Sequence, residues 1–175
     1  MSEFPPVSWS EFFLRHVYLA ASKSKDRKTK IGAVLVQDNV IVSSGYNGFP
    51  RKVNDDIEER HLRPTKYFFS AHAERNAIYN AARNGIKTLG CEVYTNVMPC
   101  SDCAIAIIQS GAKKLLIHQQ ANQILQEKAS SINGQKWLDS LDYSNVMLKE
   151  AGVELLFLDF NLNTQCMIDG KVVIV

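Results

Sequence analysis

The feature that most constrains the fold of this chain is an alternation of β-branched apolar runs with segments of helical period. Runs of strand character occupy residues 31–36, 40–46, 91–97 and 114–118, and a last one begins at residue 153. Segments with the apolar spacing of helices occupy residues 8–22, 71–84, 100–110 and 136–150. Helices at this frequency cover both faces of a sheet. The order therefore predicts an α/β domain, a three-layer α/β/α sandwich with a central mixed sheet of about five strands.

Local signals mark the ends of several elements. Ser8 and Glu11 have the spacing of a capping box at the start of the first helix. Residues 37–39 are short enough to join the first two strands as a tight hairpin. Gly85 can take the left-handed conformation that ends the second helix. Residues 47–70 show neither the helical nor the strand spacing of apolar residues and are expected to form a long irregular stretch.

Length and composition fit one domain. Of the 175 residues, 46% are hydrophobic and 22% are charged. A chain of this length with this hydrophobic content can bury a core without disulfide or metal cross-links. Lys and Arg total 20 against 18 for Asp and Glu, so the net charge of +2 demands neither a nucleic-acid nor a membrane partner. The start lacks a basic and apolar leader, and the chain has no apolar run of about 18 residues. We therefore expect a cytoplasmic protein.

Two of the four cysteines, Cys100 and Cys103, form a Cys-x-x-Cys pair. In a reducing cytoplasm such a pair favours metal binding or catalysis over a structural disulfide. Two other interpretations stay open. The pair can be two small buried residues beside an apolar helix, or a thioredoxin-type redox motif, although that motif usually follows the first strand of its domain and this pair follows the third.

The placement of the pair favours a metal. Pro99 presets the start of a helix, which puts Cys100 and Cys103 one turn apart on one face, where the helix terminus lowers thiol pKa. His72 lies where another helix begins, and helix N-termini in such sheets meet at the carboxyl ends of adjacent strands. We therefore expect the three side chains to converge on one zinc, with His72 projecting from its helix end because residues two apart do not share a helix face.

Three protein ligands leave zinc one open position, which is the mark of a catalytic site. Glu74 then has a use as a carrier of protons between water and a substrate. The alternative is that Glu74 is a fourth ligand and closes the site, but structural zinc sites are dominated by Cys and His.

The sequence HAE at 72–74, followed after residues 75–98 by PCSDC, matches the H-x-E…P-C-x-x-C pattern of zinc-dependent deaminases. Residues 24–36, 45–55, 72–78 and 99–104 together resemble the deoxycytidylate (dCMP) deaminases of the cytidine deaminase-like superfamily. The resemblance covers about residues 8–118. Residues 1–175 are thus expected to be a single deaminase domain, with a catalytic core at about 8–118 and a C-terminal helix and strands in 119–175.

The resemblance implies His72, Cys100 and Cys103 as ligands of one Zn²⁺ per chain and Glu74 as proton carrier. The reaction it implies is hydrolytic deamination of dCMP to dUMP with release of ammonia, which feeds thymidylate synthesis. It further implies a homo-oligomer, suspected to be a hexamer, with dCTP and dTTP as effectors and Mg²⁺ accompanying the triphosphate. Residues 47–70 contain His61 and no Cys, which puts the second, structural zinc of some relatives in doubt.

The substrate contacts are also carried over by position. Asn47 matches the residue that contacts the sugar, and the backbone at Ala73 and Pro99 would hold the base edge. Arg27 and Arg75 are the first candidates for the phosphate. Further candidates for a phosphate or an effector are Lys25, Lys28, Lys30, Arg51 and Lys52. The alternatives without a functional role are that Asn47 belongs only to a turn and that the charged side chains form a solvated surface.

Several functions remain open beside dCMP deamination. A dCTP deaminase would use the same metal chemistry with different contacts to the phosphates, and a deaminase of free cytidine or cytosine would need no phosphate contacts. A tRNA adenosine deaminase should display a stronger basic surface than a net charge of +2 suggests. A structural zinc module would present four Cys or His ligands, and only three occur together here.

Overall fold

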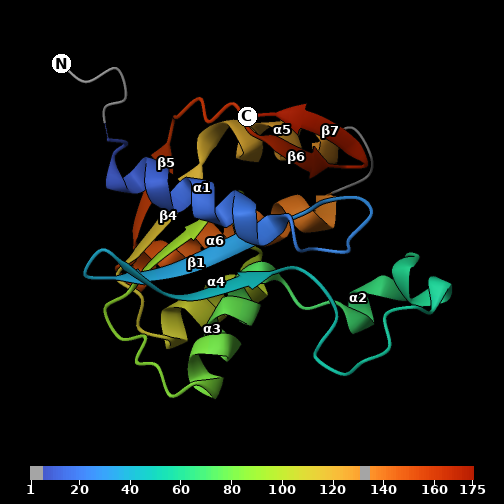
Figure 1. Cartoon of the computed structure of the whole chain (residues 1–175), viewed down its shortest axis with the longest axis horizontal. Helices are drawn as coiled ribbons and strands as arrows, with labels where there is room; N and C mark the ends of the chain where they lie inside the picture. The colour runs from blue at the N-terminus through green and yellow to red at the C-terminus, as the bar shows by residue number, and fades with distance from the viewer. Residues whose placement is uncertain (1–5, 131–134) are drawn as a thin grey trace.

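The computed structural model describes residues 6–130 and 135–175. Its centre is a five-stranded sheet in the order β2-β1-β3-β4-β5 (Figure 1). The strands are β1 (Gly32–Gln37), β2 (Val40–Tyr46), β3 (Glu92–Thr95), β4 (Lys114–His118) and β5 (Glu154–Leu158). β1 pairs antiparallel with β2 and β3, whereas β3, β4 and β5 are parallel. The predicted mixed sheet of five strands is therefore confirmed.

The first two strands form the predicted hairpin. Asp38 and Asn39 connect them with φ angles of 51° and 60°. Two central residues with positive φ are characteristic of a type I′ turn, whose twist matches that of the flanking strands, and Asn and Asp tolerate this conformation.

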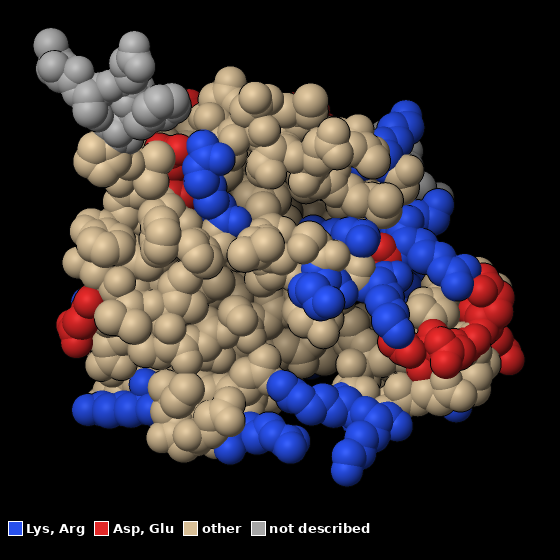
Figure 2. All heavy atoms as spheres, in the orientation of Figure 1, with Lys and Arg blue, Asp and Glu red and all other residues tan. Residues whose placement is uncertain are grey.

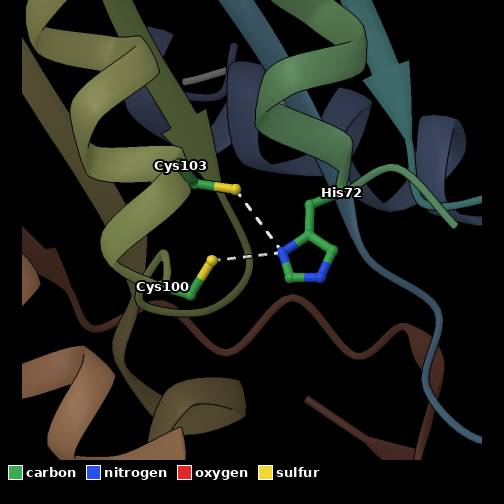
Figure 3. Close-up of side chains that lie close together, drawn as sticks. All are labelled: His72, Cys100 and Cys103. Carbon is green, nitrogen blue, oxygen red and sulfur yellow. Dashed lines mark hydrogen bonds between the residues drawn. The ribbon is translucent and has the colours of Figure 1, made fainter. Parts of the chain in front are cut away.

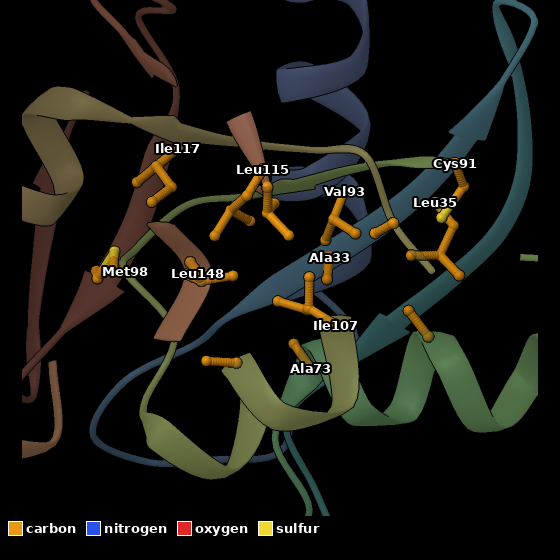
Figure 4. Packing of buried hydrophobic residues seen from close by; sticks show 14 of the residues in the cluster. Ala33, Leu35, Ala73, Cys91, Val93, Met98, Ile107, Leu115, Ile117 and Leu148 are labelled. Atoms are coloured by element: carbon orange, nitrogen blue, oxygen red, sulfur yellow. The ribbon is translucent and has the colours of Figure 1, made fainter. Parts of the chain in front are cut away.

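Helices cover both faces of the sheet. They are α1 (Trp9–Ala21), α3 (Ala73–Arg83), α4 (Ser101–Gln109), α5 (Gln119–Ser130) and α6 (Gln135–Glu150). Along β1, Ala33 and Leu35 face a core cluster shared with α3, α4 and α6, while Val34 and Val36 face a second cluster shared with α1 and α5. Figure 4 shows the first cluster, in which Ile107 of α4 lies beneath the sheet residues. The three-layer prediction is confirmed.

The long stretch after β2 is mostly irregular, as predicted. It contains the 3-10 turn η1 (Glu58–His61) and one short helix, α2 (Lys66–Phe69). A single antiparallel bridge between Gly48 and Ala71 closes the excursion. This bridge places the end of the 47–70 loop beside its beginning, directly before His72.

The C-terminal part holds two features that the predicted order omitted. α5 begins directly after β4, and a separate hairpin of β6 (Gln165–Ile168) and β7 (Lys171–Ile174) belongs to the cluster on the α1 side. The backbone N–H of Lys30 donates to Met167 O, which ties this hairpin to the segment before β1. α5 escaped detection because its sequence, QQANQILQEKAS, is rich in polar residues. No helix within the described ranges is both long and apolar enough to span a membrane.

Candidate functional site

The site forms where two helices begin. His72 is the N-cap residue of α3 and has an extended backbone, with φ −79° and ψ 159°. Cys100 is the N-cap of α4 in a similar conformation, and Cys103 follows in the first turn. Because an N-cap residue lies outside the regular helix, its side chain projects from the helix end. This is the placement expected for His72.

One expectation about the frame was wrong. The helices that carry the three side chains follow β2 and β3, which are not adjacent, because β1 lies between them in the sheet. β1 runs antiparallel to both neighbours, so β2 and β3 are parallel to each other and their carboxyl ends share one edge. The helix starts still converge across the width of one intervening strand.

The three side chains meet closely (Figure 3). The Nδ1 atom of His72 lies 3.4 Å from the Cys100 sulfur and 3.5 Å from the Cys103 sulfur. All three donor atoms lie within 4.8 Å of one another, and no second group of three such donors gathers within residues 6–130 and 135–175. A nitrogen and two sulfurs at this separation can reach one ion at the usual zinc bond lengths of about 2.0–2.3 Å. The donor set fits zinc with one position left open.

The electrostatics of the cluster favour a thiolate. The hydrogen bond from the Cys103 thiol, together with the adjacent His72, lowers the pKa of Cys100 to about 4 despite burial. The same hydrogen bond and burial raise the pKa of Cys103. The hydrogen bond with Cys100 raises the pKa of His72. A thiolate is the form of cysteine that binds a metal.

Glu74 lies beside the cluster and outside the group of three. Its side chain is buried, with 3% of its surface exposed. Burial raises the pKa of this carboxyl, and the adjacent His72 acts against that rise. Ala73 and Pro99, whose backbones were predicted to hold a base edge, are both buried next to the cluster. These roles stay predictions.

Asn47 is occupied by contacts within the protein. Its Oδ1 accepts from the Ile31 N–H at 2.9 Å, and its Nδ2 donates to Thr29 O at 2.8 Å and to an Asp26 carboxylate oxygen at 3.3 Å. The residue is 6% exposed. In this structure the amide therefore fixes the segment before β1, and its predicted contact with a sugar stays a prediction.

A cleft between residues 25–28 and the 48–70 segment collects part of the predicted cationic set, and none of His72, Glu74, Cys100 and Cys103 lines it. Lys25, Arg27 and Lys28 line it, and Ser70, two residues before His72, lines it as well. Figure 2 shows blue side chains gathered next to red ones on the right of this face. Two of the cations are paired: Lys25 contacts Asp55 at 2.7 Å, and Arg27 contacts Glu58 at 2.5 Å.

The remaining predicted cations do not line this cleft. Arg75 lies near His72, where its charge partly opposes the rise of the His72 pKa, and the buried Nε of Arg75 has no hydrogen-bond partner among the described residues. Arg51 donates to Asn80 Oδ1 at 2.5 Å. Lys52 is exposed, and Lys30 lines a separate pocket beside the β6–β7 hairpin. The structure thus divides the predicted phosphate set among several places.

Lys66 and Phe49 also line the cleft and were not singled out from the sequence. Lys66 contacts Asp26 at 2.5 Å, and its side chain is 18% exposed. The Phe49 ring stacks on His61, whose Nε2 lies 2.7 Å from Asp55 O. No local pattern marks these residues, because each reaches the cleft through the folding of the 47–70 loop.

Comparisons with known proteins agree with this geometry. Residues 7–119 match the model of the cytidine and deoxycytidylate deaminase zinc-binding region. A protein described as an uncharacterized deaminase in the luxG 3′ region of Aliivibrio fischeri is 35% identical over 156 residues, covering 88% of this chain and 96% of that protein. The deoxycytidylate deaminase of Homo sapiens is 38% identical over 116 residues, which are 63% of this chain. This chain spans 64% of the length of the human enzyme.

The solved structures include a dCMP deaminase from the cyanophage S-TIM5 in complex with dCMP and dUMP. It superposes with a TM-score of 0.66 at 25% identity, covering 89% of this chain and 100% of the phage chain. The family match spans well over half of this chain and contains His72, Cys100 and Cys103. The chain therefore belongs to the family of cytidine and deoxycytidylate deaminases that share this zinc-binding region.

Proposed function

We propose that this protein is a zinc-dependent deaminase that converts dCMP and water into dUMP and ammonia. The observation that carries the proposal is the convergence of one imidazole nitrogen and two cysteine sulfurs at two helix starts, with the buried Glu74 carboxyl beside them. The similarity to dCMP deaminases supports the choice of substrate.

His72, Cys100 and Cys103 would hold one Zn²⁺ per chain. The ion, when bound, would supply a Lewis acid and lower the pKa of a water molecule. Glu74 would accept a proton from that water and deliver it to N3 of cytosine, while the oxygen adds to C4. Glu74 would then take the remaining proton from the hydroxyl on C4 and transfer it to the amino group, so that the C4–N bond breaks, ammonia leaves and the C4 carbonyl of uracil forms. Because Glu74 is not one of the three ligands, it is free to move protons throughout.

Selection of a nucleotide over a nucleoside requires positive charge where the phosphate on the sugar binds. The cleft lined by Lys25, Arg27 and Lys28 adjoins the segment that leads into His72. Arg75 lies on the opposite side of His72 in the sequence and carries a buried Nε with no partner within the described chain. We retain Arg27 and Arg75 as the first phosphate contacts. Glu58, which pairs with Arg27 in the free protein, would release it to a bound phosphate.

A substrate panel tests the proposal. Ammonia release is measured for deoxycytidine, dCMP, dCTP, CMP and a tRNA anticodon stem. We expect the kcat/KM of dCMP to exceed that of deoxycytidine by about 10³-fold or more, because cations built to hold a phosphate are left unpaired by the nucleoside. Equal values for deoxycytidine and dCMP would remove the phosphate site, and a preference for dCTP would keep the chemistry but change the substrate.

Two variants then locate the phosphate. Arg27→Ala and Arg75→Ala should each lower kcat/KM for dCMP by at least about tenfold while changing deoxycytidine turnover little. Arg83→Ala, at an exposed position in the last turn of α3 and outside the cleft, is the matched control. Equal losses on both substrates would show that the wrong cations were chosen.

Three further expectations follow from the family. The chain would form one domain in a homo-oligomer, with a hexamer as the expected size. Its activity would respond to dCTP and dTTP, with Mg²⁺ accompanying the triphosphate, and its location would be cytoplasmic. Light scattering of the zinc-loaded protein with and without each nucleotide measures both the size and its dependence on the effectors.

A further inference from the structure

The turn that carries the cysteine pair is anchored from outside the region that matches the family model. The Met98 N–H donates to Asn122 Oδ1 at 2.8 Å, and the Ser101 N–H donates to Ser140 Oγ at 2.9 Å. Asn122 belongs to α5 and Ser140 to α6, both beyond residue 119, where the family match ends. We propose that Asn122 and Ser140 are positioning residues that clamp this turn and hold Cys100 and Cys103 in the geometry that binds zinc.

The contact with Ser140 replaces a missing helix cap. The first N–H groups of a helix have no partner within the helix and are usually satisfied by the side chain of the N-cap residue. In α4 the N-cap is Cys100, which makes no side-chain capping bond because its sulfur faces His72. The hydroxyl of Ser140 supplies the acceptor from α6, and it also lies 2.9 Å from Ser101 Oγ.

The contact with Asn122 fixes the other end of the turn. Asn122 is 4% exposed and Met98 is 5% exposed, so water cannot easily replace the hydrogen bond between them. Only Pro99 and Cys100 lie between the two anchored N–H groups. Pro99 has a fixed φ and no N–H. The Cys100 backbone is thereby restrained on both sides, and its sulfur is aimed at the His72 nitrogen (Figure 3).

The body of α4 is held by other contacts. Ala104 and Ile107 share a core cluster with Leu141 and Leu148 of α6; Figure 4 labels Ile107 and Leu148. Loss of one hydroxyl would leave this packing in place and would free only the start of the helix. The effect should therefore appear in metal affinity more than in the stability of the metal-free fold.

The inference rests on the proposed zinc centre and is tested on the full chain with Zn²⁺ itself. Zinc affinity is measured by competition with a chromogenic chelator, and thermal unfolding is followed with and without zinc. Ser140→Ala should weaken zinc binding about five- to tenfold, the effect of losing one hydrogen bond beside a ligand. Its metal-free Tm should stay near that of the parent, and the rise in Tm produced by zinc should shrink. Asn122→Ala should weaken zinc binding at least as much.

Ser144→Ala is the matched control. Ser144 lies about one turn further along α6, is fully buried, and its hydroxyl has no hydrogen-bond partner among the described residues. This variant should keep the parent affinity for zinc. If the parent binds no zinc, the metal centre itself is wrong. If the parent binds zinc and the zinc affinity of Ser140→Ala equals that of the parent or of Ser144→Ala, the clamp alone is wrong. The same conclusion holds if Ser140→Ala lowers the Tm of the metal-free protein.

Discussion

At the scale of single residues, the proposed metal centre depends on which atom of each side chain faces its neighbours. His72 presents Nδ1 to both sulfurs, and the Cys100 thiol has the lowered pKa that favours the thiolate. Because metal binding requires these deprotonated forms and a folded arrangement, its free energy contributes to folding. Changes at these residues should therefore alter metal content and stability together.

Cys100→Ser should abolish stoichiometric zinc binding, because a serine hydroxyl is not ionised at neutral pH, and should lower the Tm of protein purified with zinc. Elemental analysis and thermal unfolding measure the two effects. Cys166→Ser is the control, since Cys166 is a buried thiol of strand β6, in the core cluster on the α1 side of the sheet. Full zinc occupancy in Cys100→Ser, or two zinc ions per parent chain, would contradict the assignment.

Glu74→Gln should keep zinc and fold but lower kcat by about 10³-fold, because the amide has the shape of the carboxyl and cannot carry the proton. Ammonia release and zinc content are measured on the same sample. Loss of zinc in this variant would identify Glu74 as a ligand. Turnover within about tenfold of the parent would remove its role as proton carrier.

At the scale of elements, the start of α3 is positioned by its close approach to β2. A Cβ atom added to Gly45 would lie 2.3 Å from the Ala77 nitrogen and 2.4 Å from the Ala73 oxygen, both in the backbone of α3. The side chain of Ser43, also in β2, donates to Ala77 O at 2.7 Å. The backbones of the strand and the helix are in direct contact. The direction of α3, and with it the position of His72, therefore depends on the absence of a side chain at Gly45.

Gly45→Ala should push α3 away from the sheet and lower the free energy of unfolding by about 3 kcal/mol, at the upper end of overpacking costs. Chemical denaturation measures this. Gly48→Ala serves as the control, because its added Cβ would meet only the Tyr46 ring at 3.8 Å, and we expect a change within about 0.5 kcal/mol. Equal losses in the two variants would refute the close-approach argument.

At the scale of the whole molecule, Asp26 joins segments that are far apart in the chain. Its carboxylate accepts from the Lys28 and Thr29 N–H groups and contacts Lys66 of α2. Burial acts to raise the pKa of Asp26, but the hydrogen bond from Lys66 and those from the backbone outweigh it and lower the pKa below 3.8. The ionised form therefore stabilises the fold.

Asp26→Asn should lower the free energy of unfolding by about 2 kcal/mol at neutral pH, the typical effect of losing charged hydrogen bonds. Since the folded pKa is depressed, the advantage of the parent is fully present above pH 3.8 and fades as pH falls through the folded pKa. Urea unfolding of both proteins across the acid range measures the difference between their free energies of unfolding. Because both proteins release zinc in acid, that release cancels in the difference. A constant difference down to pH 2 would show that the charge of Asp26 is not involved.

Much of the fold followed from local signals. The helix that starts at Ser8, whose hydroxyl accepts from the Glu11 N–H at 3.2 Å, the hairpin turn at Asp38 and Asn39, and the end of α3 before Gly85 each depend on a few neighbouring residues. The same holds for the two helix starts that carry His72 and Cys100, because caps and turns are decided within one turn of chain.

Contacts between distant segments were decided only by the tertiary structure. The sequence could place neither the Asn47 amide against residues 26–31, nor Lys66 in the cleft, nor Ser140 on the start of α4, because packing of the 47–70 loop and of the C-terminal helices brings these groups together. α5 showed no clear period because it is rich in polar residues, and β6 and β7 showed none because each strand has only four residues. Spacing along the chain thus predicted which residues form the proposed metal centre, and packing determined what holds these residues and which charges surround them.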